Sequence, residues 1–340
     1  MGRVGRRVLW VSAAVVFVGG VAAYELFKHD MDPIRAAVAA GSEIAVTAAG
    51  PIEYAVRGEG VPLLSIHGAG GGYDQGFAVA DDLVGGGFNV VAPSRFGYLR
   101  TPVPDDPSPA AQAEAHVALL DSLGIDKAIV MGASAGAPSA AEMALRHPER
   151  VLALILIAPA AYAPGHLPSL DDTFGSRMVL RAVMAGADFA WWSADRVARP
   201  MLVRFLGVPP ELAAAATAVE RERLDGWVDS VLPLSARLAG IRIDSTVVLE
   251  RLPLESLAVP TLIVAARDDL FKTLPAAEFM AGQVPGAKLA VFDTGGHLFI
   301  GRAEEVQAAV REFLAGAGLA ASVAGIERPR QSAAAAGGRQ

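Results

Sequence analysis

Gly132-Ala133-Ser134-Ala135-Gly136 is the stretch of sequence that decides the fold. The apolar run Ala128-Ile129-Val130-Met131 precedes it, and a helix-like stretch from Pro138 to His147 comes after it. A G-x-S-x-G pattern between a strand and a helix predicts a sharp turn with the serine at its apex. The glycines are needed because a Cβ atom at either position would collide where strand and helix pack together. The strained turn exposes the hydroxyl of Ser134 to a base and a substrate, so the motif indicates a nucleophilic serine.

The composition of the chain favours a globular α/β protein. Its 340 residues are enough for one large domain or two smaller ones, and 53% of them are hydrophobic. The formal net charge is −7, and no basic run lies outside the N-terminus, which argues against nucleic acid as a partner. The chain has no cysteine. Disulfides, thiolate zinc sites and a cysteine nucleophile are therefore excluded.

Residues 1–30 have the pattern of an export signal or a membrane anchor. Arg3, Arg6 and Arg7 precede an apolar segment from Val8 to Ala23, which charged residues then end. The segment is short for a spanning helix, which needs about 20 residues, and Val21-Ala22-Ala23 could serve as a cleavage site. An uncleaved anchor and a cleaved signal both remain open. In either case the positive-inside rule predicts a catalytic domain outside the cytoplasm, held at the membrane if the segment is retained. The alternative is a buried N-terminal helix, which would have to hide three arginines at its start.

From Ile52 onward, short apolar runs alternate with helix-like stretches, which is typical of an α/β sheet. The continuous apolar run from Val151 to Ile157 predicts a central strand that is buried on both faces. The other predicted strands are Ile52 to Arg57, Leu63 to His67, Asn89 to Pro93, Ala128 to Met131, Pro260 to Ala265 and Lys288 to Phe292. Predicted helices run from Pro109 to Leu123, from Pro138 to His147 and from Glu304 to Phe313.

The segment from about Pro159 to Val259 breaks this alternation. It is helix-like, rich in Ala, Leu and Arg, and contains three of the four tryptophans. Because it is too long for an ordinary connection, we predict a helical cap inserted between two strands. The expected organisation is a core at residues 44–158 and 259–315 and a cap at residues 159–258. The Ala/Gly-rich tail at residues 316–340 is predicted to be disordered.

A nucleophilic serine requires a base and an acid that orients the base. After a serine turn of this kind, the expected order along the chain is Ser, Asp, His. Of the six histidines, only His297 lies on a glycine-flanked loop after the last predicted strand. Asp268 and Asp269 come after the preceding strand, and only one of them can face the histidine. Spacing from the strand end favours Asp269, with Asp268 as the alternative.

The oxyanion of such a reaction needs two backbone N–H donors. One should be Ala135, the residue after the nucleophile, at a helix N-terminus. The other should be Ala69, in the loop Gly68-Ala69-Gly70-Gly71-Gly72. Gly68 and Gly70 are candidates for substrate contact, because they let the backbone approach closely. This loop lacks the lysine of a phosphate-binding loop and the spacing of a dinucleotide site.

Trp191 and Trp192, in the predicted cap, are further candidates for substrate contact. The alternative for these side chains is that they pack the cap against the sheet.

Together these motifs resemble the α/β-hydrolase fold superfamily, over about Ile52 to Leu314. The match is carried by four pieces in the correct order: His67-Gly68-Ala69-Gly70, the serine pentapeptide, Arg267-Asp268-Asp269 and Gly295-Gly296-His297. The stretch from Ala92 to Tyr98 resembles the family's Asp-x-x-Gly-x-Gly loop, although a Ser-Arg pair replaces the acidic position. The resemblance implies an eight-stranded, mostly parallel sheet with helices on both faces, a cap over the serine, no metal and no organic cofactor.

The nucleophile narrows the reaction that the resemblance implies. Haloalkane dehalogenases and epoxide hydrolases of this fold use an aspartate at the elbow, so Ser134 argues against both. A serine implies an acyl-enzyme, and the default is a carboxylesterase-like enzyme acting on a small to medium hydrophobic ester. Alternatives are a carbon–carbon bond hydrolase, which usually carries a fuller Gly-Gly-Gly-Pro-Gly loop, and a cofactor-free haloperoxidase-like enzyme. A catalytically silent binding protein of the same fold is the alternative from a different class.

Overall fold

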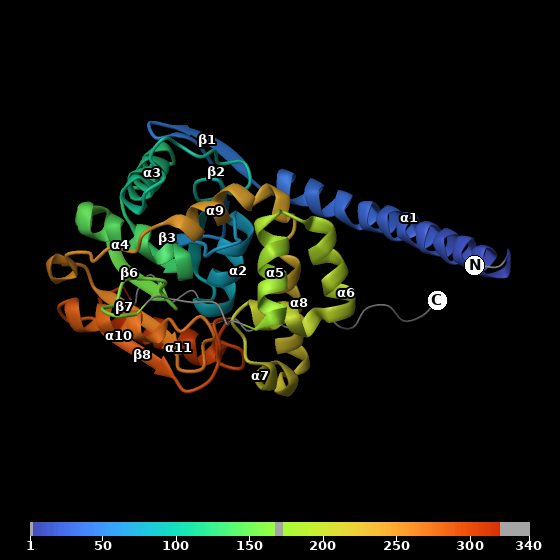
Figure 1. The fold of residues 1–340 in the computed structure, drawn as a ribbon. Helices are drawn as coiled ribbons and strands as arrows, with labels where there is room; N and C mark the ends of the chain where they lie inside the picture. Colours follow the sequence, from blue (N-terminus) through green and yellow to red (C-terminus); the bar gives the residue numbers. More distant parts are fainter. Residues whose placement is uncertain (1–2, 167–172, 320–340) are drawn as a thin grey trace, which may run out of the picture.

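The computed structural model describes residues 3–166 and 173–319 and is built on one eight-stranded sheet (Figure 1). The strands have the spatial order β1-β2-β4-β3-β5-β6-β7-β8, and all pairs from β4 to β8 are parallel. Only β1 and β2 join the sheet in antiparallel register. This architecture confirms the prediction of an eight-stranded, mostly parallel sheet. The strands are β1 (Glu43–Thr47), β2 (Gly50–Arg57), β3 (Val61–Ile66), β4 (Phe88–Pro93), β5 (Ala128–Ala133), β6 (Val151–Ile157), β7 (Thr261–Ala266) and β8 (Lys288–Phe292).

Helices cover both faces of this sheet. Side chains alternate between the faces along each strand, so Leu64 and Val130 join one apolar cluster while Leu63 and Ile129 join another. Helices α3 (Pro109–Ser122), α4 (Ala137–Arg146) and α10 (Leu274–Gln283) contribute to the first cluster. Helices α2 (Tyr73–Leu83) and α11 (Ala303–Gly316) contribute to the second. The sheet is therefore sandwiched between two helical layers, and its carboxyl edge is left for the loops.

A group of helices is inserted between β6 and β7, at one side of the sheet (Figure 1). Buried side chains of this cap, such as Leu202, Val228 and Leu234, form a third apolar cluster, which Tyr98 and Leu298 from loops of the core also join. The helices are α5 (Phe174–Met184), α6 (Asp188–Phe205), α7 (Pro210–Ala215), α8 (Ala218–Asp229) and α9 (Leu238–Thr246). The cap can therefore hold its shape and present fixed groups to the sheet edge.

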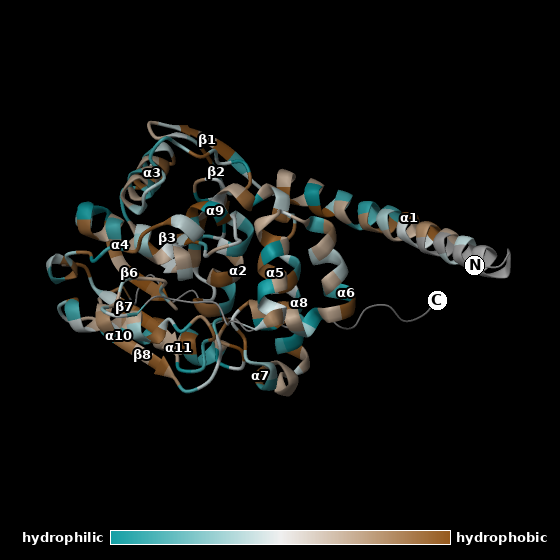
Figure 2. Ribbon diagram, viewed as in Figure 1, coloured by the Kyte–Doolittle hydropathy of each residue, from teal (hydrophilic) through white to brown (hydrophobic). Residues whose placement is uncertain are grey.

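Helix α1 (Arg3–Ala40) corrects one prediction. It is a single helix of 38 residues whose N-terminal part projects away from the body. Within the described residues, no helix combines the length and the apolar character that a membrane crossing requires. The predicted N-terminal membrane anchor, and the localisation that rested on it, are therefore wrong. The apolar segment is the start of a longer helix whose second half carries charged side chains (Figure 2).

The second half of α1 packs on the cap. Phe27 and Met31 are buried, and the rings of Phe27 and Trp192 meet edge to face at 5.7 Å. Arg35 forms an ion pair with Asp188 of α6 at 3.0 Å. Helix α11 ends at Gly316, where the predicted tail begins. Residues 320–340 lie outside the described residues.

Candidate active site

The serine motif forms a sharp turn between β5 and α4. Ser134 has a φ of +48°, a left-handed conformation that costs a residue with a side chain about 1–2 kcal/mol. A Cβ atom on Gly132 would lie 2.6 Å from the Cβ of Ala140, and one on Gly136 would lie 2.6 Å from the carbonyl oxygen of His67. Only glycine fits at these two positions, which is the physical reason for the pattern. The turn places Ser134 at the carboxyl edge of the sheet.

His297 and Asp269 form a buried pair at the same edge. The two residues come after β8 and β7, and Nδ1 of His297 lies 3.0 Å from Oδ2 of Asp269. The same carboxylate accepts hydrogen bonds from Thr273 Oγ1 at 2.5 Å and from the Phe271 N–H at 2.8 Å. Burial alone would raise the pKa of Asp269, but the His297 charge and these hydrogen bonds outweigh burial and lower it. The carboxylate is thus held ionised, as the orienting partner of an imidazole must be.

The neighbouring Asp268 has a different set of partners. Its two carboxylate oxygens accept hydrogen bonds from the backbone N–H groups of Gly296 at 2.8 Å and Gly295 at 3.2 Å. Asp268 therefore holds the loop that carries the histidine, while Asp269 meets the imidazole itself. The two adjacent aspartates therefore bind different parts of one loop: Asp268 binds its backbone at Gly295 and Gly296, and Asp269 binds the imidazole of His297.

Gly207, in the turn between α6 and α7, is a site residue that sequence reasoning missed. Its carbonyl oxygen accepts hydrogen bonds from the N–H groups of His297 at 3.1 Å and Leu270 at 3.3 Å. Its φ is +82°, and a Cβ atom there would lie 2.6 Å from the Cβ of His297. Arg223 of α8 also donates to the carbonyl of Leu298. The sequence shows only a glycine after a helix, which is a common helix end.

The glycine-rich loop after β3 lies against the serine. A Cβ atom on Gly68 would be 3.1 Å from the Cβ of Ser134 and 3.8 Å from its Oγ, so Gly68 leaves room for the hydroxyl. Ala69 is exposed, Ala135 is half-buried at the start of the helical turn after β5, and Gly70 has a φ of +74°. Ser134, Ala135 and the Gly68–Gly70 loop are therefore close together.

No hydrogen bond joins Ser134 to His297 within the described part of the chain. Such bonds are often long before substrate binds and tighten in the complex.

The two candidate tryptophans of the cap lie inside it. Trp191 is 1% exposed and Trp192 is 5% exposed. Their indole N–H groups donate to the Val228 carbonyl at 3.0 Å and to Asp30 Oδ2 of α1 at 3.1 Å. The structure does not bring them to Ser134. Their large apolar rings are used to build the core between α1, α6 and α8.

Two buried histidines near the elbow are held neutral. His67, just after β3, accepts a hydrogen bond at Nε2 from the Arg95 N–H at 2.9 Å, so its proton lies on Nδ1, 2.7 Å from the Gly68 carbonyl. Burial, aided by the Arg95 charge, puts the pKa of His67 well below its usual value. Burial likewise lowers the pKa of His116 to about 3.

These histidines should make the protein sensitive to acid. The unfolded chain binds a proton near pH 6.5, while folded His116 does so only near pH 3, so stability is lost as pH falls between these values. Each such histidine contributes a slope of about 1.4 kcal/mol per pH unit within that window. Urea unfolding of His116→Gln between pH 6 and 4 should show a slope smaller by about this amount. The exposed His29→Gln is the control, and an equal change in both variants would contradict the assignment.

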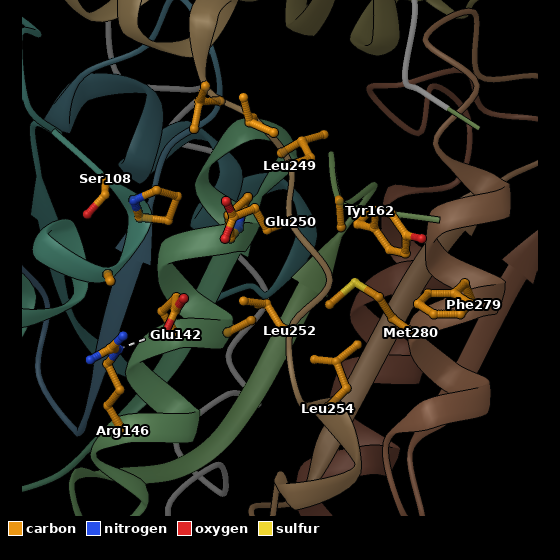
Figure 3. Close-up of a pocket in the computed structure, with 17 residues that line it drawn as sticks. Ser108, Glu142, Arg146, Tyr162, Leu249, Glu250, Leu252, Leu254, Phe279 and Met280 are labelled. Atoms are coloured by element: carbon orange, nitrogen blue, oxygen red, sulfur yellow. Dashed lines mark hydrogen bonds and ion pairs between the residues drawn. The ribbon is translucent and has the colours of Figure 1, made fainter. Parts of the chain in front are cut away.

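A cavity of about 380 Å³ runs beside α4 (Figure 3), and its lining does not include Ser134, Asp269 or His297. Its walls are mostly apolar and include Leu252, Leu254 and Met280. A smaller cavity of about 30 Å³ shares Pro109, Pro138 and Val247 with it and reaches Ala135. Among residues 3–166 and 173–319, no group of three or more His, Asp or Glu side chains is placed to hold a metal ion.

Comparison with known proteins agrees with this fold. Residues 61–301 match the alpha/beta hydrolase fold family. The chain is 30% identical to a 2-hydroxymuconate semialdehyde hydrolase of Pseudomonas putida, over 76% of this chain and 89% of the other. An alpha/beta hydrolase fold protein from Nakamurella multipartita has 27% identity and a TM-score of 0.64, covering 82% of this chain and 99% of that one.

A more distant structure shares the fold alone. An esterase from Exiguobacterium antarcticum has 19% identity and a TM-score of 0.58, covering 81% of this chain and 98% of its own. The family match spans most of the sheet, the serine turn and the loop of His297. The chain belongs to the α/β-hydrolase fold family.

Proposed function

We propose that this protein is a serine hydrolase that cleaves a hydrophobic carboxylic ester through an acyl-enzyme, with Ser134, His297 and Asp269 as its triad. The observation that carries the proposal is the strained Ser134, at φ +48°, on the sheet edge that also bears the His297–Asp269 pair. Strain at a non-glycine residue persists where the surrounding structure enforces it and is concentrated at functional sites.

The expected reaction has two halves. His297 takes the proton of Ser134 as Oγ attacks the ester carbonyl, and the resulting oxyanion binds the N–H groups of Ala69 and Ala135. When the tetrahedral intermediate collapses, the C–O bond to the alcohol breaks and the imidazolium gives the alcohol its proton. Water, deprotonated by His297, then attacks the acyl-enzyme and releases the acid and free Ser134. Asp269 stabilises the imidazolium that forms in each half.

The charges around the glycine-rich loop favour a neutral substrate. Arg95 is held by both oxygens of Asp244, with its Nη2 2.6 Å from Oδ2. Arg237 is fully buried and paired with Asp74 at 2.6 Å. Both guanidinium groups beside this loop are therefore already neutralised, and neither is free to bind a carboxylate of the substrate. An ester without charge fits this surrounding best.

The cavity beside α4 supports an apolar substrate. Its lining continues through Pro138 and Val247 to the smaller cavity at Ala135, whose N–H is a proposed oxyanion donor. A volume of about 380 Å³ is of the size that small-molecule sites usually have. We place the hydrophobic part of the ester in this cavity (Figure 3).

A carbon–carbon bond hydrolase is the second candidate. It is favoured by the 30% identity to the 2-hydroxymuconate semialdehyde hydrolase, whose named substrate is a carboxylate. The same triad could serve that reaction. A carbon–carbon bond hydrolase of this kind needs a cation to bind the carboxylate of its substrate. Arg95 and Arg237 do not supply one, because each is paired with an aspartate.

A substrate panel separates the two candidates. We expect hydrolysis of p-nitrophenyl butyrate and octanoate in preference to acetate, because the longer acyl chains fill the apolar cavity. A fluorophosphonate probe should label the protein at one site, found at Ser134 by peptide mass spectrometry. A kcat/KM for 2-hydroxymuconate semialdehyde that exceeds the best ester value by tenfold or more would reverse the assignment.

A further inference from the structure

The glycine-rich loop is fixed from behind by a buried network that reaches into the cap. The carbonyl oxygen of Gly68 lies 2.7 Å from Nδ1 of His67 and accepts a hydrogen bond from Arg95 Nη2 at 3.1 Å. This carbonyl belongs to the same peptide unit as the N–H of Ala69, and in a trans peptide the two groups point in opposite directions. Donors that hold the carbonyl therefore aim the Ala69 N–H the other way.

The next N–H of the loop is already used. Gly70 donates to the hydroxyl of Tyr98 at 3.2 Å, while the N–H of Ala69 has no acceptor within the part of the chain that the structure describes. Of these two neighbouring N–H groups, the one at Ala69 is therefore left for a substrate oxyanion. The direction of the Ala69 N–H depends on two side chains. Arg95 holds the peptide unit between Gly68 and Ala69, and Tyr98 holds the one between Ala69 and Gly70.

Both of these side chains depend on one cap residue, Asp244 of α9. Its carboxylate accepts two hydrogen bonds from Arg95, at 2.8 and 2.6 Å, and a third from the Tyr98 hydroxyl at 2.5 Å. Arg95 and Asp244 are only 8% and 10% exposed. Burial and the Asp244 charge put the pKa of Tyr98 well above its usual value, so its hydroxyl remains a donor.

Helix α9 is seated closely on the loop that carries Arg95 and Tyr98. The Gly240 N–H donates to the Gly97 carbonyl at 2.8 Å, and a Cβ atom on Gly240 would collide with the ring of Tyr98. Asp244 is four residues further along α9 and so lies on the same face of the helix. The glycine contact therefore brings the carboxylate to Arg95.

We propose that Asp244 is a positioning residue for the oxyanion hole: it holds Arg95 and Tyr98, and through them the backbone that directs the Ala69 N–H. The inference rests on the proposed ester hydrolysis and assigns the cap a part in it. Seating α9 on the core completes the oxyanion hole, and displacing α9 releases the Gly68–Gly70 loop.

The test compares Asp244→Asn with Asp188→Asn. Asp188 is also a buried cap aspartate paired with an arginine, Arg35, but it makes no contact with the glycine-rich loop. We expect Asp244→Asn to lower kcat for p-nitrophenyl butyrate by about 10- to 100-fold, because loss of one oxyanion donor costs about 100- to 1000-fold and here the donor is only misdirected. KM should change less than threefold. Asp188→Asn should keep kcat within twofold.

Two further readouts separate positioning from a general loss of structure. The Ki of a trifluoromethyl ketone with the same acyl chain, which forms an oxyanion on Ser134, should rise by the factor by which kcat falls. Tyr98→Phe should lower kcat about tenfold, and its effect should not multiply with that of Asp244→Asn, because both act on one loop. An Asp244→Asn variant with kcat and Ki within twofold of wild type would overturn the proposal, as would an equal loss in Asp188→Asn.

Amide hydrogen exchange tests the same placement without relying on turnover. Peptides that cover residues 67–72 should exchange at least tenfold faster in Asp244→Asn than in wild type or Asp188→Asn. Unchanged exchange would refute the role of Asp244 in fixing the loop. If wild type hydrolyses no ester and takes no fluorophosphonate, the proposed function fails, and the exchange result still decides whether Asp244 positions the loop.

Discussion

Replacing Ser134 by alanine should lower kcat for p-nitrophenyl butyrate by about 10⁶-fold and abolish fluorophosphonate labelling. The alanine keeps the oxyanion donors and the substrate cavity but removes the only atom that can carry the acyl group. Because an alanine at φ +48° bears the same backbone strain as serine, the free energy of unfolding should stay within about 0.5 kcal/mol of wild type. Stopped assays with up to micromolar enzyme would measure the residual rate.

Ser134→Gly is the matched variant. It should be as inactive as Ser134→Ala, yet more stable by roughly 0.5–1 kcal/mol, since glycine relieves the left-handed strain but gains entropy in the unfolded chain. Urea unfolding of the three proteins measures this difference. A Ser134→Ala protein that retains more than one hundredth of wild-type kcat would place the nucleophile elsewhere.

Replacing Asp269 by asparagine should lower kcat by about 10⁴-fold. The amide cannot stabilise the imidazolium, and its NH₂ group favours the imidazole tautomer that has its proton on the wrong nitrogen. KM should change little, because Asp269 is 4% exposed and is bound to Thr273, Phe271 and His297 rather than facing the cavity. Steady-state kinetics from pH 6 to 9 would show the loss at every pH.

Asp268→Asn is the neighbouring control. It removes a charge from the hydrogen bonds to Gly295 and Gly296, so we expect a loss of about 1–2 kcal/mol in unfolding free energy and a fall in kcat of less than tenfold. A larger loss of kcat in Asp268→Asn than in Asp269→Asn would transfer the role of triad acid to Asp268.

Much of the sheet could be predicted because its strands have strong local signals. The predicted strand from Val151 to Ile157 is β6 itself, and the run from Lys288 to Phe292 is β8. The edge strand β1 was missed because it is short and largely exposed, and such strands lack a continuous apolar run. The helix-like segment before β7 was visible, but the roles of Gly207 and Asp244 within it were not.

The N-terminus shows how a local pattern can mislead. Arginines before an apolar run are typical of an anchor, but that pattern takes no account of the residues after Ala23. The same helix continues to Ala40 and buries Phe27 and Met31 against the cap. The part of this helix after Ala23 packs on neighbours that lie far away in the sequence, such as Trp192 of α6.

The sequence by itself determined the serine turn and the succession of strands around it. These features depend on neighbouring residues: two glycines that a Cβ would make impossible, and apolar runs whose length and composition specify a buried strand. Only the tertiary structure decided which aspartate meets His297, where Trp191 and Trp192 pack, and how α9 reaches the glycine-rich loop. Asp269 is 28 residues from its histidine, and Asp244 is 149 residues from Arg95. Such pairs form only when the packing of the sheet and cap brings distant segments together, and no local pattern records that packing.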